Sequence, residues 1–241
     1  MNISKIGFQT SRYNGLSLDA ELNFAFKNKV GYFEFFFDGF LPQDLKKNEI
    51  NAIKKFSKNF IYTVHCPIAS YFDYPIFLDA IIDFSFKIEA KIITIHFDKL
   101  SIGTAEKIYG KLDDKIIFSI ENTTVDFNNI HKLTYLNFMN TATKNLKLAA
   151  TFDAGHALLS SGNYIAFLNS LLENSISISE IHAHNNDGKA DNHSQLNCGI
   201  IDFKKIFLLL NNKGLTVPFI IEHWQNNTSS LDVLKTLKNY R

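Results

Sequence analysis

Short apolar runs recur along the chain, and each is bounded by polar or turn residues. Runs of this length, rich in β-branched and aromatic residues, are typical of buried parallel strands. The runs occupy residues 3–9, 32–37, 60–66, 91–97, 115–121, 148–154, 178–184 and 217–223. The pattern therefore predicts eight strands, one in each run.

Longer segments with a helical spacing of apolar residues lie between the predicted strands. The clearest are residues 17–29, 74–90, 158–175 and 201–213. Ser17 and Asp202 are suited to begin helices, because their side chains can accept a hydrogen bond from a free backbone N–H. Gly214 is suited to end one, since glycine readily takes the left-handed conformation found after helices. Strand and helix are thus expected to alternate.

Eight strand–helix units with a period of about 30 residues predict an α/β fold, a (β/α)8 TIM barrel. A doubly wound open sheet has the same spacing, but it requires a reordering of strands that nothing in the sequence indicates. No linker or low-complexity segment divides the chain, so residues 1–241 are expected to form a single domain. In such a barrel the active site lies at the C-terminal rim of the strands.

Charge and cysteine content narrow the functional classes. The net charge is +1, so no global electrostatic attraction to nucleic acid or membrane is expected. Two cysteines are too few for a disulfide framework, which indicates a reducing compartment. The N-terminus lacks a secretory signal, and no apolar run is long enough to cross a membrane. We expect a cytoplasmic protein, and the oligomeric state stays open.

Ionisable residues mark the ends of six consecutive predicted strands, from the third to the eighth. A lone histidine at such a position is more often a hydrogen-bonded rim residue than a ligand. Many such groups on one rim without counterions would be strongly disfavoured by desolvation and repulsion, and divalent cations remove that cost. Histidine with carboxylate, and no cysteine cluster, suits zinc first, with manganese or iron as alternatives. The candidate metal ligands are His65, His96, Glu121, Asp153, His156, His184, Asp191, His193 and Glu222.

Six short motifs carry a family resemblance. In chain order they are VHCPI, TIHF, IENT, FDAGHA, HNNDGKADNH and IIEH, each at the end of a predicted strand. With these motifs the chain resembles the xylose isomerase-like TIM barrels over essentially its whole length. That superfamily includes endonuclease IV, an abasic-site endonuclease, and many sugar or sugar-phosphate isomerases and epimerases.

The resemblance leans toward endonuclease IV, which implies up to three metal ions. It implies His65 and His96 for the first metal, with Glu121 bridging to the second, Asp153, His184 and Glu222 for the second, and His156, Asp191 and His193 for the third. The sugar isomerases need only the second set. His182 is instead expected to be a core histidine that hydrogen-bonds a neighbour.

Three functions remain open on this basis. The first is a metal-dependent phosphoester hydrolase in which Glu121, Asp153 and Glu222 act catalytically. Metals about 3.5–4 Å apart can lower the pKa of a shared water and stabilise the attacking and leaving oxygens. The second is a sugar or sugar-phosphate isomerase or epimerase, in which Glu121 and Glu222 move a proton next to a carbonyl with one metal. The third is a member that only binds metal or ligand.

The substrate is expected to be a phosphorylated or sugar molecule. Abasic DNA is less favoured, because FDGFLPQD (residues 37–44) has acid where a DNA-facing basic residue is expected, and phosphate contacts dominate DNA affinity. A further set of residues is expected to contact the substrate or to orient the ligands. These residues are Glu34, Tyr71, Phe72, Asn122 and Trp224.

Overall fold

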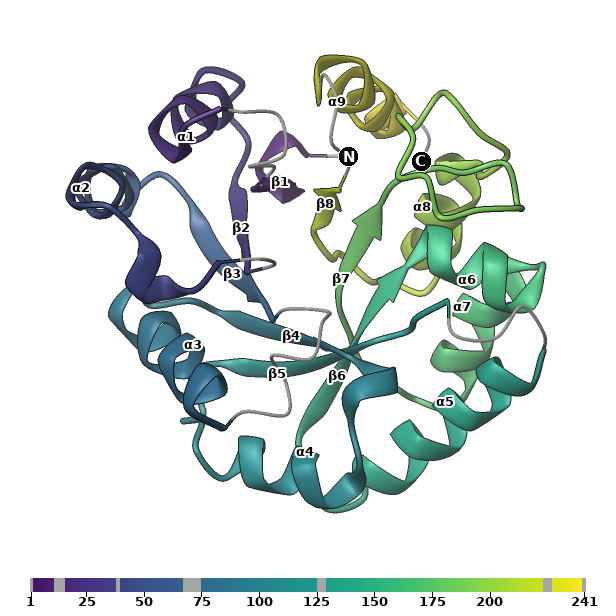
Figure 1. Cartoon of the computed structure of the whole chain (residues 1–241). Helices are drawn as coiled ribbons and strands as arrows, with labels where there is room; N and C mark the ends of the chain where they lie inside the picture. The colour runs from purple at the N-terminus through teal and green to yellow at the C-terminus, as the bar shows by residue number, and fades with distance from the viewer. Residues whose placement is uncertain are drawn as a thin grey trace.

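Eight parallel strands form a closed barrel in a computed structural model of the chain. The structure describes residues 2–10, 16–37, 40–66, 75–124, 129–222 and 227–239. The strands follow one another in sequence order around the barrel, and β1 pairs with β8 to close it. Figure 1 shows the strands inside a ring of helices. The predicted α/β class and (β/α)8 TIM barrel are confirmed.

Each strand lies inside one of the predicted apolar runs. The strands are β1 (Ile6–Gln9), β2 (Tyr32–Phe36), β3 (Ile61–His65), β4 (Ile92–His96), β5 (Ile117–Glu121), β6 (Leu148–Asp153), β7 (Ile178–Ala183) and β8 (Phe219–Ile221). Each observed strand is shorter than its apolar run.

The helices follow the strands in the expected alternation. They are α1 (Leu18–Lys27), α2 (Lys47–Phe56), α3 (Pro75–Lys87), α4 (Ile102–Tyr109), α5 (Asn129–Ala142), α6 (Ala154–Ser161), α7 (Tyr164–Glu173), α8 (Phe203–Asn212) and α9 (Asn227–Thr236). Short 3-10 turns occupy Ile3–Lys5, Pro42–Asp44, Phe97–Lys99 and Leu237–Asn239. Among the described residues, none of these helices is both long and apolar enough to cross a membrane.

The predicted helix starts and stop are confirmed. The Ser17 side chain accepts a hydrogen bond from the backbone of Ala20, and Asp202 accepts one from Lys204. Gly214 follows α8 with a φ of +70°. The single helix predicted over residues 158–175 is wrong, because the chain breaks into α6 and α7 at Gly162, whose φ is +67°. Apolar spacing continues on both sides of this break and hides it from the sequence.

The barrel interior is polar, and the apolar core lies between the strands and the helices. Thr94 of β4 donates a hydrogen bond to Glu180 of β7 at 2.7 Å, and Ser119 of β5 contacts Ser179 of β7 at 2.7 Å. These strands are not neighbours, so the side chains meet inside the barrel. Outward-facing residues such as Phe152 are fully buried against the helices. The barrel therefore carries polar groups up its axis toward the rim.

Candidate metal centre at the barrel rim

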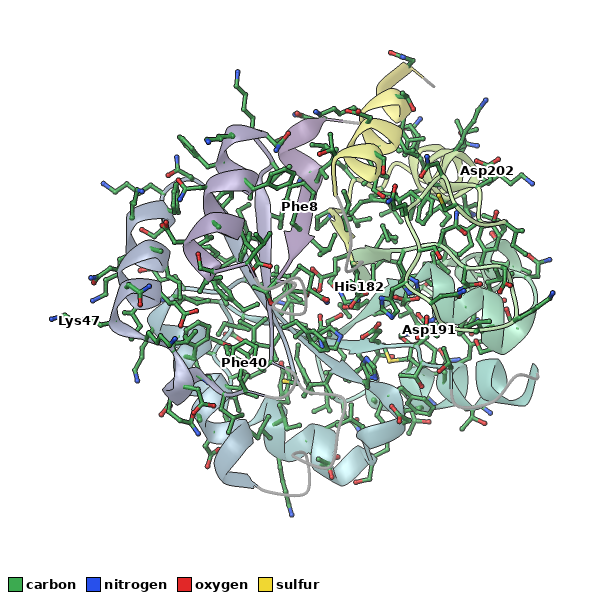
Figure 2. The ribbon with its side chains drawn as sticks, turned by 45° about the horizontal axis from the view of Figure 1, so that its top comes forward. Phe8, Phe40, Lys47, His182, Asp191 and Asp202 are labelled. Carbon is green, nitrogen blue, oxygen red and sulfur yellow. The ribbon has the colours of Figure 1, made fainter. Side chains whose placement is uncertain are left out.

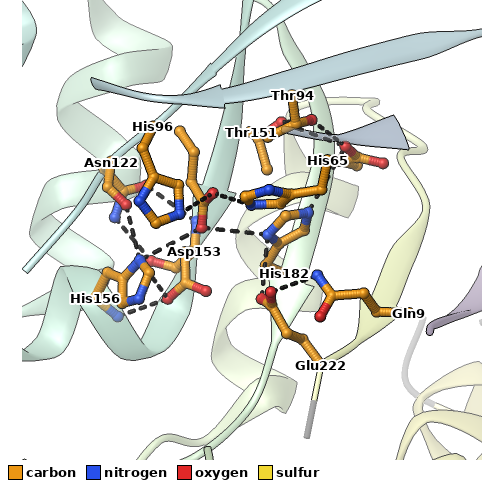
Figure 3. Close-up of polar contacts among 12 residues, drawn as sticks. Gln9, His65, Thr94, His96, Asn122, Thr151, Asp153, His156, His182 and Glu222 are labelled. Atoms are coloured by element: carbon orange, nitrogen blue, oxygen red, sulfur yellow. Dashed lines mark hydrogen bonds and ion pairs between the residues drawn. The ribbon is translucent and has the colours of Figure 1, made fainter. Parts of the chain in front are cut away.

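Glu121, the last residue of β5, lies at the centre of a histidine cluster. Its Oε2 is 2.7 Å from His65 Nε2 and 3.0 Å from His96 Nε2. Its Oε1 is 3.2 Å from His182 Nδ1 and 3.3 Å from His156 Nδ1. The four imidazoles come from β3, β4, β7 and α6 (Figure 3). Separate elements thus bring four imidazole nitrogens to one buried carboxylate.

A second set of donors surrounds His182. Its Nδ1 is 3.1 Å from Glu222 Oε2, beside the contact with Glu121. One ligand atom each from Glu121, Asp153, His182 and Glu222 lie within 4.8 Å of one another. We refer to the strand-end donors together as the inner group. The inner group consists of His65, His96, Glu121, Asp153, His182 and Glu222.

A third set of donors lies beside the inner group, where α6 meets the loop after β7. We call it the outer group, and it consists of His156, His184, Asp191 and His193. Asp191 Oδ2 is 3.1 Å from His156 Nε2 and 3.4 Å from His193 Nε2. Figure 2 shows Asp191 toward α6, with His182 nearer the centre of the barrel. The side chain of Asp191 is 29% exposed, so the outer group faces solvent more than the inner group does.

The FDAGHA motif links the two groups through local structure. Asp153 ends β6 and caps α6, where it accepts a hydrogen bond from the backbone of His156 at 2.6 Å. Asn122 donates to the Asp153 carbonyl at 2.9 Å and accepts from its backbone N–H at 3.0 Å. The Asn122 side chain therefore fixes the end of β6 against the end of β5. This placement fits the expected role of Asn122 in orienting a ligand.

Glu34 and Gln9 lie beneath the inner group. The Gln9 amide donates to Glu34 Oε1 at 3.0 Å and also to Glu222 Oε1. Glu34 Oε1 is 3.4 Å from His182 Nε2, and its side chain is fully buried. Of the two roles expected for Glu34, this position fits the orientation of His182. Gln9 was missed by sequence reasoning, although it is the polar residue that ends β1. Tyr71, Phe72 and Trp224 lie outside the described residues.

The structure brings both His182 and His184 to the donor groups. His182, expected in the core, faces Glu121 and Glu222, whereas His184 lies 3.0 Å from Asp153 Oδ2 and stacks on His193. β6 and β7 pair Asp153 with His182, so His182 lies at the level of the strand ends. The strand ends at Ala183, so His184 stands above the level of Asp153. Alternation puts both histidines on one face, and the pairing register distinguishes them.

Opposite charges control the protonation of the metal-free site. Burial by itself would raise the pKa of Glu121, but the charges of His96, His182 and His65 hold it well below its usual value. Burial opposes the charge on His65, yet Glu121 raises the pKa of His65 to about 9. Burial likewise opposes the charge on His193, and the hydrogen bond with Asp191 raises its pKa to about 9. Without metal, protonated His65 and His193 therefore balance part of the carboxylate charge.

The donor chemistry fits divalent ions. Among the described residues, Glu222 Oε2 and Asp191 Oδ1 are buried without a hydrogen-bond partner, although histidine nitrogens lie near both. Buried polar atoms normally have hydrogen bonds, so close nitrogen and oxygen atoms without one suit a shared cation. The free cysteines, Cys66 and Cys198, are in neither group. Nitrogen and oxygen ligands of this kind favour zinc, manganese or iron.

A separate cavity of about 930 Å³ opens between α2 and α3. Its apolar walls include Ile50, Phe60 and Phe84, with Lys54 and Lys87 among its polar residues. No residue of the inner or outer group lines it. The donor groups therefore identify the candidate site, and this cavity is a distinct feature of the barrel wall.

Comparison with known proteins supports the same architecture. The model of one family, described as the xylose isomerase-like TIM barrel, matches residues 105–240, more than half of the chain. No curated protein matches the sequence.

Several solved structures are similar in fold. A D-tagatose 3-epimerase-like protein has a TM-score of 0.75 and 18% identity, over 98% of this chain and 96% of that protein. An L-ribulose 3-epimerase has a TM-score of 0.67 and 13% identity, over 98% and 86%. SacUVDE, a UV endonuclease, has a TM-score of 0.63 and 14% identity, over 98% of both chains. At these identities the likeness shows the fold alone.

Proposed function

The chain belongs to the xylose isomerase-like TIM barrel family, and we propose that it is a divalent-metal-dependent enzyme that hydrolyses phosphoester bonds. The observation that carries this proposal is the surplus of donors. The set of Glu121, Asp153, His182 and Glu222 is sufficient for one metal. His65, His96 and the outer group would have no metal to bind in a one-metal enzyme. A site for several metals gives each of these donors a task.

The donor sets suggest how up to three ions would be held. His65, His96 and Glu121 suit one ion, and Glu121 with Asp153, His182 and Glu222 suit a second. His156, Asp191 and His193 suit a third, and zinc is the first choice for all three. Bound divalent ions would lower the pKa of a water molecule and withdraw charge from a phosphoryl oxygen.

Residues of the chain would fix the carboxylates that bind the ions. Gln9 holds one oxygen of Glu222 and leaves Oε2 without a hydrogen bond among the described residues. That oxygen would be free to bind the second ion. Asn122 fixes the backbone of Asp153, which keeps its carboxylate at the rim. Carboxylates fixed in this way reduce the reorganisation that hydrolysis requires.

A small phosphorylated molecule is the favoured substrate. Among the described residues, only histidines form ion pairs with Glu121, Asp153 and Glu222, so these carboxylates have no lysine or arginine partner there. Binding of duplex DNA relies mainly on lysine and arginine contacts to phosphates, and the chain has a net charge of only +1. An abasic duplex is therefore the second substrate to test.

The second candidate function is epimerisation or isomerisation of a sugar or sugar phosphate. One observation favours it: Glu121 and Glu222 both contact His182 Nδ1, at 3.2 and 3.1 Å. Two carboxylates placed around one metal could remove and return a proton beside a carbonyl. The similar folds of a D-tagatose 3-epimerase-like protein and an L-ribulose 3-epimerase agree with this alternative.

Metal content and activity, measured together, test the proposal. The untagged protein is analysed for metals, and then assayed with bis-p-nitrophenyl phosphate, small sugar phosphates, an abasic duplex and free ketoses. We expect two or three metals per chain and phosphoester hydrolysis. One metal per chain with epimerisation of a ketose would overturn the hydrolase proposal in favour of the second candidate.

A variant of the outer group separates the two candidates further. Asp191→Asn weakens the outer group and leaves the inner group intact. We expect hydrolysis to fall at least tenfold, because loss of a ligand or its support usually costs that much. An enzyme that needs only the inner group would retain its activity. Asn192→Ala, which changes an exposed neighbour in the same loop, is the matched control.

A further inference from the structure

Asn185, the residue after His184, is bonded to three later residues of the loop that follows β7. Its backbone N–H donates to the Ser194 carbonyl at 2.9 Å, and its carbonyl accepts from the Ser194 N–H at 2.8 Å. Its side-chain amide donates to the carbonyls of Leu196 at 2.7 Å and Ile201 at 3.1 Å. A single residue therefore closes the loop between positions 185 and 201.

The hydrogen-bonding capacity of the Asn185 side chain is completely used. The side chain is fully buried. Its two N–H bonds are directed at two carbonyls, and its oxygen accepts from the backbone N–H of Ile201 at 2.9 Å and of Asn186 at 3.0 Å. Aspartate has the same shape, but it would turn a carboxylate oxygen toward the two carbonyls, where a donor is needed. The position therefore requires an amide and not only a side chain of this size.

Gly199 allows the loop backbone to approach this amide. A Cβ atom at position 199 would lie 2.2 Å from Asn185 Oδ1 and 2.5 Å from its Cγ, closer than unbonded atoms can pack. The loop thus wraps tightly around the side chain that closes it. A change in the shape or polarity of that side chain must therefore alter the path of the loop.

The loop closed by Asn185 carries two donors of the outer group. Asp191 and His193 both lie between Asn185 and Ser194, and His193 directly precedes Ser194. His184 directly precedes Asn185, so the pairing of Asn185 with Ser194 brings the two histidines together. Their rings stack with centroids 3.9 Å apart. Asn185 belongs to neither donor group, and its effect on the outer group would be transmitted through the backbone.

We propose that Asn185 is a positioning residue for the outer ion, because it closes the loop that places Asp191 and His193. The inference rests on the proposed metal-dependent function. With the loop open the same ligands would be present, but only the closed fraction would be ready to bind, and the apparent affinity would fall with that fraction. The coupling is reciprocal, so a bound outer ion would in turn stabilise the closed loop.

Metal titration of Asn185→Ala and Asn185→Asp tests this role. Cobalt(II) is titrated into the metal-free protein against a chromophoric chelator, and Asp191→Asn identifies the binding step that belongs to the outer ion. We expect that step to weaken about tenfold or more in both Asn185 variants, with the inner steps unchanged. Saturating metal should restore hydrolysis of bis-p-nitrophenyl phosphate, because every ligand is still present.

Two control variants separate positioning from general stability. Asn192→Ala removes an exposed amide from the same loop, and it should bind metal as the wild type does. Tyr62→Phe removes a buried hydrogen bond to the Ile53 carbonyl, beside the cavity between α2 and α3. It should lower the melting temperature and leave all metal affinities unchanged.

Hydrogen exchange of the wild-type protein tests the reciprocal effect without any variant. We expect the outer ion to slow exchange in residues 186–199 more than in the strands, because the loop opens at lower free energy. Asp191→Asn should lack this protection.

Three outcomes would overturn the inference. The first is an outer ion that binds both Asn185 variants as tightly as the wild type. The second is an equal loss of outer affinity in Tyr62→Phe, which would make the effect one of general stability. The third is loop exchange that does not change when the outer ion binds. A wild-type protein that binds no metal would instead refute the proposed function, so the two failures are distinguishable.

Discussion

The inner and outer groups use similar donors on different supports. Most of the inner group ends strands, where pairing aligns His96 with Glu121 and Asp153 with His182. The outer group comes from the start of α6, the residue after β7 and the loop that follows. Inner-group residues are at most 7% exposed, whereas the Asp191 side chain is 29% exposed. The barrel therefore fixes the inner geometry, and local contacts must fix the outer one.

The loop after β7 is held mainly by hydrogen bonds. Asn185 pairs with Ser194 through both backbone groups, and its side chain donates to the carbonyls of Leu196 and Ile201. Segments held this way open at lower free energy than core strands do. The two groups should therefore respond differently to loss of a ligand.

The largest effect is expected for Glu121→Gln. This isosteric change removes the charge that faces four imidazoles, so it should abolish inner-group metal binding and activity. Breaking a buried ion pair should also destabilise the metal-free fold by about 3–5 kcal/mol, as measured by urea unfolding. Glu106→Gln, on the exposed face of α4, is the control. If the two variants unfold alike, Glu121 does not hold the inner group together.

A change in the outer group should act on that group alone. His193→Ala should remove one metal ion and strongly reduce activity, while inner-group binding persists. Elemental analysis and urea unfolding measure these effects, with Asn192→Ala as the control in the same loop. Full metal content together with unchanged turnover would show that the outer group does not bind a functional ion.

Glycine substitutions test the close approach of Gly155 to the His184 ring. A Cβ at position 155 would lie 2.0 Å from His184 Cε1, so Gly155→Ala should displace the ring and lower the free energy of unfolding by about 1–3 kcal/mol. Gly103→Ala is a close match, because Gly103 is also the second residue of its helix and has open space around it. It should be stabilising by roughly 0.5–1 kcal/mol. Thermal unfolding compares the two variants. Equal shifts in melting temperature would show that the contact between Gly155 and the His184 ring does not limit the size of residue 155.

Proton release gives the smallest signal and reports on both groups. The pKa values of His65 and His193 are raised to about 9, so both are protonated at pH 7.5 without metal. Metal must displace these protons, and apparent affinity should rise with pH up to about 9. Calorimetry in buffers of different ionisation enthalpy counts the protons released. Binding without proton release would contradict the raised pKa values.

The same histidines set the pH dependence of the metal-free fold. A histidine whose pKa is raised above its unfolded value of about 6.5 stabilises the folded state. This contribution is complete below about pH 6.5 and is lost as the pH rises through about 9. The melting temperature of the metal-free protein should therefore fall between pH 7 and 9.5. The metal-loaded protein, whose imidazoles are already deprotonated, should lack this fall.

Strand positions could be predicted from the sequence because each apolar run ends in polar residues. The location of the site at the C-terminal rim was predicted from the polar residue at the end of each run. The order of the motifs along the chain indicated the family. The level of a residue within the barrel could not be predicted, because it depends on how neighbouring strands align. The contacts of His182 with Glu121 and Glu222 were missed for this reason. Gln9 was overlooked because a lone amide at a strand end carries no chemical signature.

The backbone of His193 connects stability with function. Its φ of +42° lies in the left-handed region, which residues other than glycine adopt uncommonly and which histidine, asparagine and aspartate enter more often than the rest. Such a conformation costs on the order of 1–3 kcal/mol and persists only where other contacts hold it. His193 meets Asp191, the ring of His184 and the carbonyl of Glu222. We interpret the backbone strain at position 193 as the cost of directing the His193 side chain into the outer group. A substitution there that raises the melting temperature should therefore lower metal affinity.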